Sequence, residues 1–263
     1  MLSLPSRLSL ALLCIVPTLA FAQAKSDLVI SEDFEGTAAG AVPAGFTKAG
    51  AVGVVEDVAH SGKKSLRIEA AKNGARRITR QGAEIAALGG EHWGRLYFKV
   101  QLPTASPVIP EGKKFAVIHS TLVSGKATSP LFNDAIEVRP LDTVLGPNGQ
   151  FQWLYNVQPK QRPEFATGSK YRFTYTSDWT LAEWHVDHAT QTYECFINGE
   201  EVKEITLHKG AGKFEGAEIP AVFESLSFGW NNYQAAEPGF VAWIDDIALS
   251  KKRIGPLAVA AKK

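Results

Sequence analysis

The sequence predicts an all-β protein, folded as a sandwich of two sheets or a jelly roll. Short runs in which apolar and polar residues alternate recur along the chain, among them "WGRLYFKVQLP", "AIEVRPL", "QFQWLYNVQ" and "VAWIDDIALS". Such alternation is typical of half-buried strands. Clusters of Gly, Pro and Asn separate the runs, and past the first residues only "GAEIAALGG" (82–90) has apolar residues at helical spacing. Many short strands at regular intervals favour a double-sheet architecture.

The first 24 residues differ in composition from the rest of the chain. They combine a positive charge at Arg7, an apolar run over 8–19 and small residues at positions 20, 22 and 24. This pattern predicts a secretory signal peptide over residues 1–24, cleaved after Ala22 or Ala24. We therefore expect an exported protein, either secreted or periplasmic. No later segment approaches the roughly 20 apolar residues that a spanning helix needs, so we expect no membrane partner.

Residues 25–252 contain no repeat and no flexible linker, so we expect one domain, followed by a loose tail over 253–263. The chain without its signal peptide keeps a single cysteine, Cys195, which excludes an internal disulfide. Lys and Arg number 28 against 27 acidic residues, so no global field selects nucleic acid. We expect a monomer whose partner, if anionic, meets local positive charge.

One long hairpin carries a family resemblance. "LAEWHVDHATQTYECFINGEEV" turns at Asn198-Gly199, a dipeptide typical of tight hairpins. It resembles a pattern found in concanavalin A-like sandwiches. The resemblance implies a concanavalin A-like β-jelly-roll sandwich of two antiparallel sheets, with this hairpin on the convex sheet. His185 and His188 are then part of the scaffold.

Acidic residues lie near both ends of the expected domain, in "SEDFEG" and "WIDDIALS", and "AHSGKKSLRI" follows the first of them. The three segments resemble the framework of carbohydrate-binding jelly rolls that hold a structural Ca²⁺, an ion that takes roughly six to eight oxygen ligands. The resemblance implies ligands from each segment: Glu32 or Asp33, the carbonyl of Ser61 or Lys64, and Asp245 or Asp246. The alternative is a set of acidic strand ends that face water.

His119 interrupts an apolar strand, "FAVIHSTL", on the face shared by Phe115, Val117 and Thr121. It is either a hydrogen-bonded structural histidine or part of a site. "ARRITRQG" precedes it, with Arg76 and Arg80 on one strand face around Ile78, and "QWLYN" and "SFGWNNYQ" follow it. Adjacent amides such as those of "WNNY" are poor strand formers, which favours a binding role for them.

This order of segments resembles the jelly-roll polysaccharide lyases, the alginate-lyase and glucuronan-lyase-like group. Alginate lyases of this kind carry Arg-x-x-x-Arg, then Gln-Ile-His, then Lys-Ala-Gly-x-Tyr-Asn-Gln. The match is partial: Val117 stands in the place of the glutamine, and Ile78-Thr79 replaces Glu-Leu. The tyrosine of the last motif corresponds to Asn231 or, after a shift of two residues, to Tyr233.

The resemblance implies cleavage of a uronic-acid polysaccharide by β-elimination on a concave sheet. A base removes the C5 proton, an acid protonates the departing O4, and cationic or amide donors neutralise the carboxylate. Neutral imidazole suits the first role near neutral pH. The implied catalytic residues are His119 as base, Tyr233 as acid (with Tyr155 as the alternative), and Arg76, Arg80 and Asn231 as neutralising groups. The implied substrate-binding residues are Arg139, Trp153, Tyr155, Trp230 and Asn232.

The same residues bear on three other functions. A non-catalytic carbohydrate-binding jelly roll would keep the aromatic residues and calcium but would need no base and acid. A retaining glycoside hydrolase needs two carboxylates about 5–5.5 Å apart, and only Glu183 and Asp187, in the convex hairpin, offer a pair. A serine or thiol nucleophile has no support, because no Gly-x-Ser-x-Gly motif is present and Cys195 lies in an expected strand.

Overall fold

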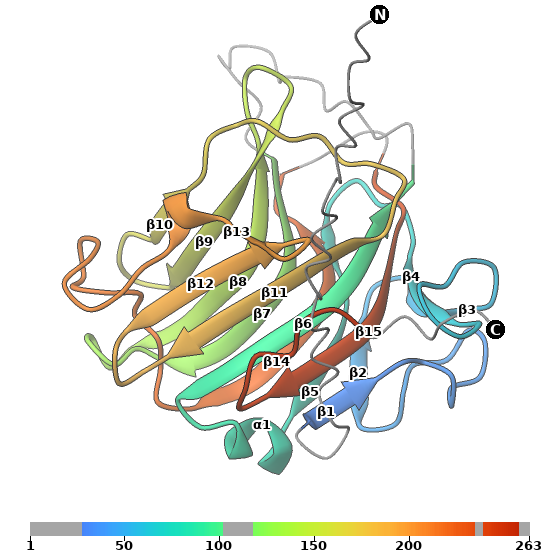
Figure 1. Cartoon of the computed structure of the whole chain (residues 1–263), viewed down its shortest axis with the longest axis horizontal. Coiled ribbons are helices and arrows are strands. Elements are labelled where there is room, and N and C mark those ends of the chain that lie inside the picture. The colour runs from blue at the N-terminus through green and yellow to red at the C-terminus, as the bar shows by residue number, and fades with distance from the viewer. Residues whose placement is uncertain (1–27, 102–117, 235–238, 258–263) are drawn as a thin grey trace, which may run out of the picture.

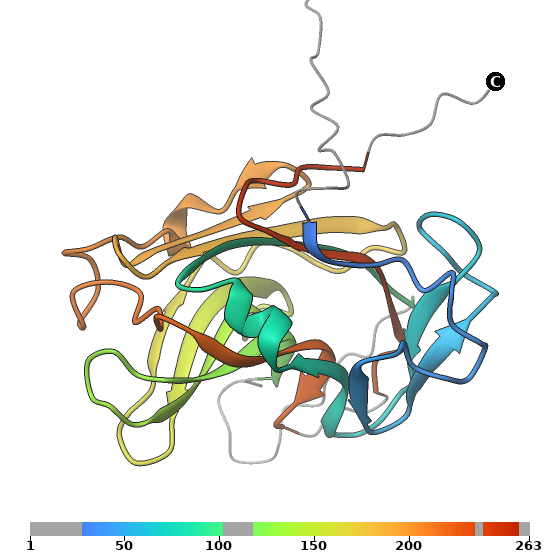
Figure 2. The same cartoon turned by 90° about the horizontal axis from the view of Figure 1, so that it is seen from below.

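The computed structural model describes residues 28–101, 118–234 and 239–257. Two antiparallel sheets lie face to face across these residues (Figures 1 and 2). The predicted all-β jelly-roll sandwich is therefore confirmed. The predicted signal peptide lies outside the described residues. Within the described part of the chain, no helix is long and apolar enough to cross a membrane.

One sheet has eight strands among the described residues, in the order β13-β12-β11-β6-β15-β4-β3, with β1 paired to β15. Its strands are β1 (Leu28–Glu32), β3 (Val52–Val55), β4 (Ser65–Ile68), β6 (Glu91–Val100), β11 (Thr180–Asp187), β12 (Thr192–Ile197), β13 (Glu200–Glu201) and β15 (Ala242–Ser250).

The other sheet has seven strands within the described ranges, in the order β10-β9-β8-β7-β14-β5-β2. Its strands are β2 (Phe46–Ala49), β5 (Gly74–Gln81), β7 (Ile118–Thr128), β8 (Ala135–Leu145), β9 (Phe151–Pro159), β10 (Phe165–Gly168) and β14 (Phe223–Asn232). A short helix, α1 (Ala83–Ala87), follows β5 inside the segment 82–90, and a 3₁₀ turn covers Lys203–Ile205.

The core lies between the sheets and is rich in large aromatic side chains. Trp184 and Tyr193 from the eight-stranded sheet, and Tyr155, Phe228 and Trp230 from the seven-stranded sheet, are all fully buried. Burial of a large apolar side chain contributes about 1.5–3 kcal/mol. Cys195 is buried and free, and burial raises the pKa of its thiol to about 12. The thiol is therefore protonated at neutral pH.

The chain that follows β15 lies across the outer face of the eight-stranded sheet, on the upper side of Figure 2. The Gly255 N–H donates to Glu183 at 2.8 Å, and Arg95 donates to the Gly255 carbonyl at 3.0 Å. The Leu257 N–H donates to the Tyr97 hydroxyl at 3.0 Å. Residues 253–257 of the predicted loose tail are thus attached to the sheet, because their backbone polar groups pair with charged and phenolic side chains. Residues 258–263 lie outside the described ranges.

Because His92 is buried, we expect the free energy of unfolding to fall in acid. His92 accepts a hydrogen bond from the Trp184 indole at 3.3 Å, and burial lowers its pKa to about 3. Its unfolded pKa is about 6.5, so below that pH the unfolded chain binds one more proton than the native protein. We expect this residue to lower the free energy of unfolding by up to about 1.4 kcal/mol per pH unit below pH ~6.5. Urea unfolding between pH 8 and pH 4 measures the loss, and in His92→Phe the slope should be shallower by one proton. Equal slopes in both proteins would contradict the assignment.

Candidate functional site on the outer face of the seven-stranded sheet

The side of the seven-stranded sheet that faces away from the core is mostly polar, with Val144 and Leu154 as apolar exceptions. Side chains alternate along each strand, so the neighbours of core residues point outward. We call this surface the outer polar face. Its members are Arg77 and Thr79 on β5, His119, Thr121, Ser124 and Lys126 on β7, Glu137, Arg139 and Asp142 on β8, Asn156 on β9, and Ser225, Ser227 and Asn231 on β14.

His119 lies on this face and is paired with a buried carboxylate. Its neighbour Ile118 packs into the core, whereas the His119 side chain is 15% exposed and its Nδ1 lies 3.2 Å from Oδ2 of the fully buried Asp142. The other oxygen of Asp142 accepts the Thr143 N–H at 2.8 Å. A carboxylate fixed in this way favours the tautomer with hydrogen on Nδ1, which leaves the Nε2 lone pair as a base. Sequence reasoning identified His119 but missed Asp142.

Tyr233 and Arg139 form a second pair on the same face. The Arg139 guanidinium donates to the Tyr233 hydroxyl, and its Cζ lies 4.3 Å from the ring centroid. Arg139 also donates to Glu137 at 3.2 Å, and its Nη1 lies 3.9 Å from Asp142 Oδ2. Partial burial raises the pKa of Tyr233, and the charge of Arg139 opposes that rise. Arg139 therefore connects the phenol to the carboxylate that faces His119.

The end of β14 holds the backbone of His119 in place. The Asn232 amide donates to the His119 carbonyl and to Ser120 Oγ, both at 2.9 Å. Its oxygen accepts from Arg76 at 2.5 Å. The His119 N–H donates to the Gln234 side chain at 3.1 Å. The amides of "GWNNYQ" are thus satisfied partly within the protein, and the hydrogen bonds of Asn232 give it a structural role.

Arg76 and Arg80 do not belong to the outer polar face, so the structure does not bring them together with His119. They share the strand face of Ile78, which is fully buried. Arg76 is 2% exposed, donates to the carbonyls of residues 69 and 71, and has a pKa lowered by burial. Arg80 pairs with Glu84 of α1.

The outward arginine of β5 is Arg77. Its Nη1 donates to Ser124 at 3.2 Å and lies 4.0 Å from Glu137. The apolar Ile78 between Arg76 and Arg80 was the signal that could have found it, because an isoleucine marks the core face of a strand.

The three aromatic residues expected to contact substrate belong to the core instead. Tyr155 is fully buried and its hydroxyl donates to the Ala217 carbonyl. Trp230 is also fully buried, with its ring centroid 5.5 Å from that of Phe240. Trp153 is 7% exposed and lines a hollow of about 480 Å³ near the edge strands β10 and β13. These rings alternate with outward residues of β9 and β14, and the sandwich needs them as core.

The expected calcium corner brings together two of its three segments. The N–H groups of His60 and Ser61 donate to Asp245 Oδ2 at 2.8 and 3.3 Å. Asp246 lies 2.7 Å from His60 Nδ1 and accepts from Ser61 Oγ at 2.8 Å. The turn after β3 therefore does meet the last strand.

The third segment contributes differently from the expected ligand set. β1 pairs with β15 so that Glu32 lies opposite Ile247, but the Glu32 carboxylate accepts the Phe34 N–H at 2.8 Å. Glu35, rather than Glu32, reaches the turn, where it accepts the N–H groups of Lys63 and Lys64 at 2.7 Å each. The turn points N–H donors at these carboxylates, where the resemblance implied carbonyl ligands.

The residues of this corner therefore fit a calcium ion only in part. Burial and the adjacent Asp246 raise the pKa of Asp245 to about 7. A bound cation would stabilise the ionised form of this carboxylate. No three His, Cys, Asp or Glu side chains of the described residues converge as a metal site. Calcium stays a prediction, and no step of the function proposed below passes through it.

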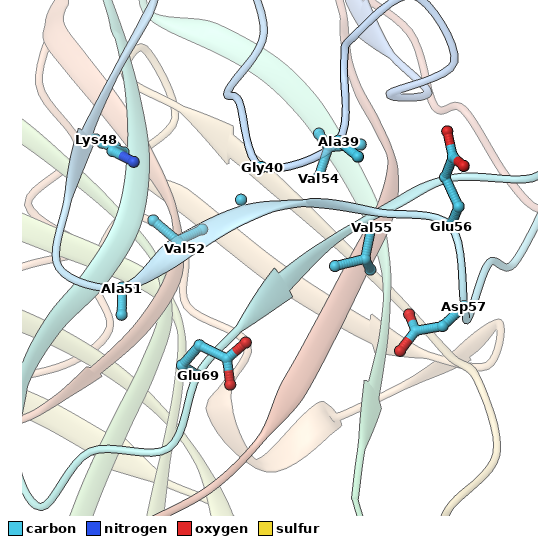
Figure 3. Close-up of a pocket in the computed structure, with 11 residues that line it drawn as sticks. Ala39, Gly40, Lys48, Ala51, Val52, Val54, Val55, Glu56, Asp57 and Glu69 are labelled. Carbon is cyan, nitrogen blue, oxygen red and sulfur yellow. The ribbon is translucent and has the colours of Figure 1, made fainter.

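A separate hollow of about 710 Å³ lies beside β3, at the edge of the eight-stranded sheet (Figure 3). Val52 and Val55 form part of its lining, and Asp57 and Glu69 also border it. Both acids pair with Arg67, at 3.3 and 2.9 Å. None of the residues predicted to be catalytic or substrate-binding lines it.

The structural role of Asn232 predicts a loss of stability on its removal. Asn232→Ala removes the partner of the buried Arg76 Nη2 and one donor to the His119 carbonyl, and each buried group left unsatisfied costs about 1–3 kcal/mol. We expect the midpoint of urea unfolding to fall accordingly. Asn231→Ala, a matched change at the neighbouring position on the outer polar face, should alter the midpoint much less. Equal effects of the two changes would contradict the structural role.

If the protein binds calcium, the midpoint of thermal unfolding should rise when calcium is added. If Asp245 and Asp246 hold the ion, calcium at about a hundred times its Kd should stabilise the protein by about 2.7 kcal/mol. Magnesium should have a smaller effect, since it favours stricter octahedral geometry. Asp246→Asn should abolish the rise and still tolerate the positive φ of 51° at this position. A midpoint that is the same in calcium and in a chelator would remove calcium from this corner.

No protein-family model and no curated protein sequence matches this chain. Among solved structures the chain is similar to the cellulose induced protein Cip1, with 18% identity, 86% of this chain and 99% of that chain covered, and a TM-score of 0.55. It is also similar to the receptor binding domain of botulinum neurotoxin mosaic serotype C/D, at 12% identity and a TM-score of 0.50, over 88% of this chain and 48% of that one. The chain thus spans about half of the toxin domain. At these identities the likeness establishes the jelly-roll fold alone.

Proposed function

We propose that the outer polar face around His119 binds a uronic-acid-containing polysaccharide and cleaves it by β-elimination. The observation that carries the proposal is the presence on one face of a histidine oriented to accept a proton and a tyrosine held by an arginine. His119 is oriented by the buried Asp142, and the Tyr233 hydroxyl is held by Arg139, which itself lies 3.9 Å from Asp142. A base and an acid linked through a shared carboxylate suit a reaction that takes one proton and gives another.

The proposed reaction begins at Nε2 of His119, whose lone pair is free to accept a proton. Nε2 takes the C5 proton of the uronate, the electron pair forms the C4=C5 double bond, and the C4–O4 bond breaks. Tyr233 gives its hydroxyl proton to the departing O4. Proton exchange with water then returns both side chains to their starting forms. The pKa of Tyr233, raised by its partial burial, keeps the phenol protonated at neutral pH, as an acid must be.

Neutralisation of the substrate carboxylate makes C5 acidic enough for this step. Arg139 is 3% exposed and directed at the same face, and Arg77 and Asn231 are further donors on it. Residual donors of Arg139 and Arg77 can bind a carboxylate because a guanidinium carries five N–H groups. The neutralising arginines of the proposal are therefore Arg77 and Arg139, in place of Arg76 and Arg80.

A non-catalytic carbohydrate-binding protein is the alternative. It would need a flat aromatic platform, and Trp153 and Trp230 are buried in the core. Cip1, one similar structure, is described as cellulose-induced, which agrees with a carbohydrate partner but names no reaction. The proposal also places the protein outside the cytoplasm, as the pattern of residues 1–24 predicts.

Absorbance near ~235 nm, where the unsaturated product of β-elimination absorbs, tests the proposal on a panel of uronate polymers. We expect a rise with the wild-type protein, and a loss of about 10²- to 10⁴-fold in kcat for His119→Ala and for Tyr233→Phe. His208→Ala, at an exposed histidine of the eight-stranded side, is the matched control and should keep full activity. No rise with any polymer, together with measurable binding of one of them, would favour the non-catalytic alternative.

A further inference from the structure

A hollow of about 480 Å³ opens at one flank of the sandwich, beside β10 and β13, which are edge strands of the two sheets (Figure 1). Its size is typical of sites that take small ligands, at roughly 300–1,000 Å³. One wall holds Trp153 of β9 and Phe173, and the other is formed by residues 197–198 and 200–202 around the turn between β12 and β13. None of the described residues of the outer polar face lines the hollow. It is therefore a separate place on the molecule, with its own chemistry.

The first wall is aromatic, and its rings are held by other rings of the core. Trp153 and Phe173 are stacked, with their ring centroids 4.9 Å apart and their planes 13° from parallel. The Phe173 centroid also lies 5.7 Å from that of Phe151 and 5.6 Å from that of Tyr175. Trp153 is 7% exposed, whereas Phe173 is half-buried, so Phe173 offers the ring that a ligand can reach. A ring held in this way loses little conformational freedom when a ligand packs on it.

The opposite wall carries polar groups that are open to solvent and have unused hydrogen-bonding capacity. Asn198 and Glu200 are exposed, and Glu201 is half-buried. Oδ1 of Asn198 accepts the Leu181 N–H at 3.0 Å, and the amide NH2 group has no partner among the described residues. Glu200 likewise has no partner within the described chain, and Glu201 uses one oxygen to accept from Thr206 at 2.6 Å. This wall therefore offers an amide donor and several carboxylate oxygens.

The charges around the hollow balance, so they favour neither an anion nor a cation. Arg172 is the one cation among the described residues that line it, and its guanidinium pairs with Glu204 at 2.6 Å. Lys170 and Lys203 are exposed next to lining residues in the chain and offset the two glutamates of the polar wall. An ionised carboxylate only accepts hydrogen bonds, so a ligand that contacts this wall must donate. A neutral sugar meets both conditions, since its hydroxyl groups donate and accept and its C–H face packs on an aromatic ring.

We propose that the hollow is a second carbohydrate-binding site, which takes a neutral sugar independently of the reaction at His119. The C–H face of the sugar packs on Phe173. Its hydroxyl groups donate to Glu200 and Glu201, and one of them accepts from the Asn198 amide. Because the site is a pocket and not a flat platform, it holds a single sugar unit of a longer chain. The protein then binds a uronate on the outer polar face and a neutral sugar at the flank.

Calorimetric titration of the full chain with neutral tetrasaccharides of glucose, xylose, mannose or galactose tests the proposal. We expect at least one of them to bind with a Kd of about 1 mM or tighter. Asn198→Asp should weaken that binding about three- to tenfold, because it loses the free donor but still accepts the Leu181 N–H. Aspartate also tolerates the positive φ of 51° at this position. Glu200→Ala should weaken binding by a similar factor through the loss of an acceptor.

Two control variants locate the binding. Glu224→Ala, at an exposed glutamate of β14, and His119→Ala should both bind the tetrasaccharide as the wild type does. Residues 198 and 200 are exposed, so the thermal midpoints of Asn198→Asp and Glu200→Ala should match that of the wild type. If one of these two variants lowers the midpoint, the other carries the test.

The proposal is overturned if no neutral tetrasaccharide binds, if neither Asn198→Asp nor Glu200→Ala weakens binding, or if His119→Ala abolishes it. Tighter binding of a glucosamine or galacturonate tetrasaccharide, located at the hollow by its loss in Asn198→Asp, would overturn the choice of a neutral sugar. The absorbance assay for unsaturated product reports on the outer polar face alone. A failure of the lyase proposal therefore leaves the second site standing, and a failure of the second site leaves the lyase proposal standing.

Discussion

Burial of one side of the seven-stranded sheet decides the direction of every side chain on it. Successive residues of a strand point to opposite faces, so a single core residue fixes its neighbours. Trp153, Tyr155 and Val157 fill the core from β9 and leave Asn156 outside. The outer polar face exists because most large apolar residues of its strands point inward and contact the opposite sheet.

The same alternation explains how far the site could be predicted. The strands, the double-sheet fold, His119 and Tyr233 followed from the sequence pattern and the partial family resemblance. Whether Arg76 or Arg77 points outward also follows from the alternation of side chains along β5. Ile78 is fully buried, so Arg76 lies on the core face with it and Arg77 lies on the outer face. The positions of Trp153 and Trp230 could not be predicted in this way, since a tryptophan is equally suited to a protein core and to a surface that stacks on sugars.

Asp142 could not be predicted, because the register of β8 shifts between Arg139 and Asp142. A bulge brings residues three apart onto one face, whereas strict alternation would separate them. Pro140 in "RPLD" is the one signal of that shift, because a proline inside a central strand is typical of a bulge, but it does not show which residues change face. The bulge has a functional consequence under the proposal, since it allows Arg139 and its carboxylate to stand side by side near His119. Irregular strand geometry near sites is a recurrent feature of sheets.

The segment 253–257 lies on the eight-stranded sheet and forms backbone hydrogen bonds with Glu183, Arg95 and Tyr97. The two broad faces of the sandwich are consequently unlike: one is partly closed by the protein's own chain, over β6 and β11, and the other carries His119. Because Leu257 lies on the closed side, attachment of the protein to a solid support through residues beyond it would direct the outer polar face towards the liquid. Under the proposed function, a polymer would then approach from the side opposite the support.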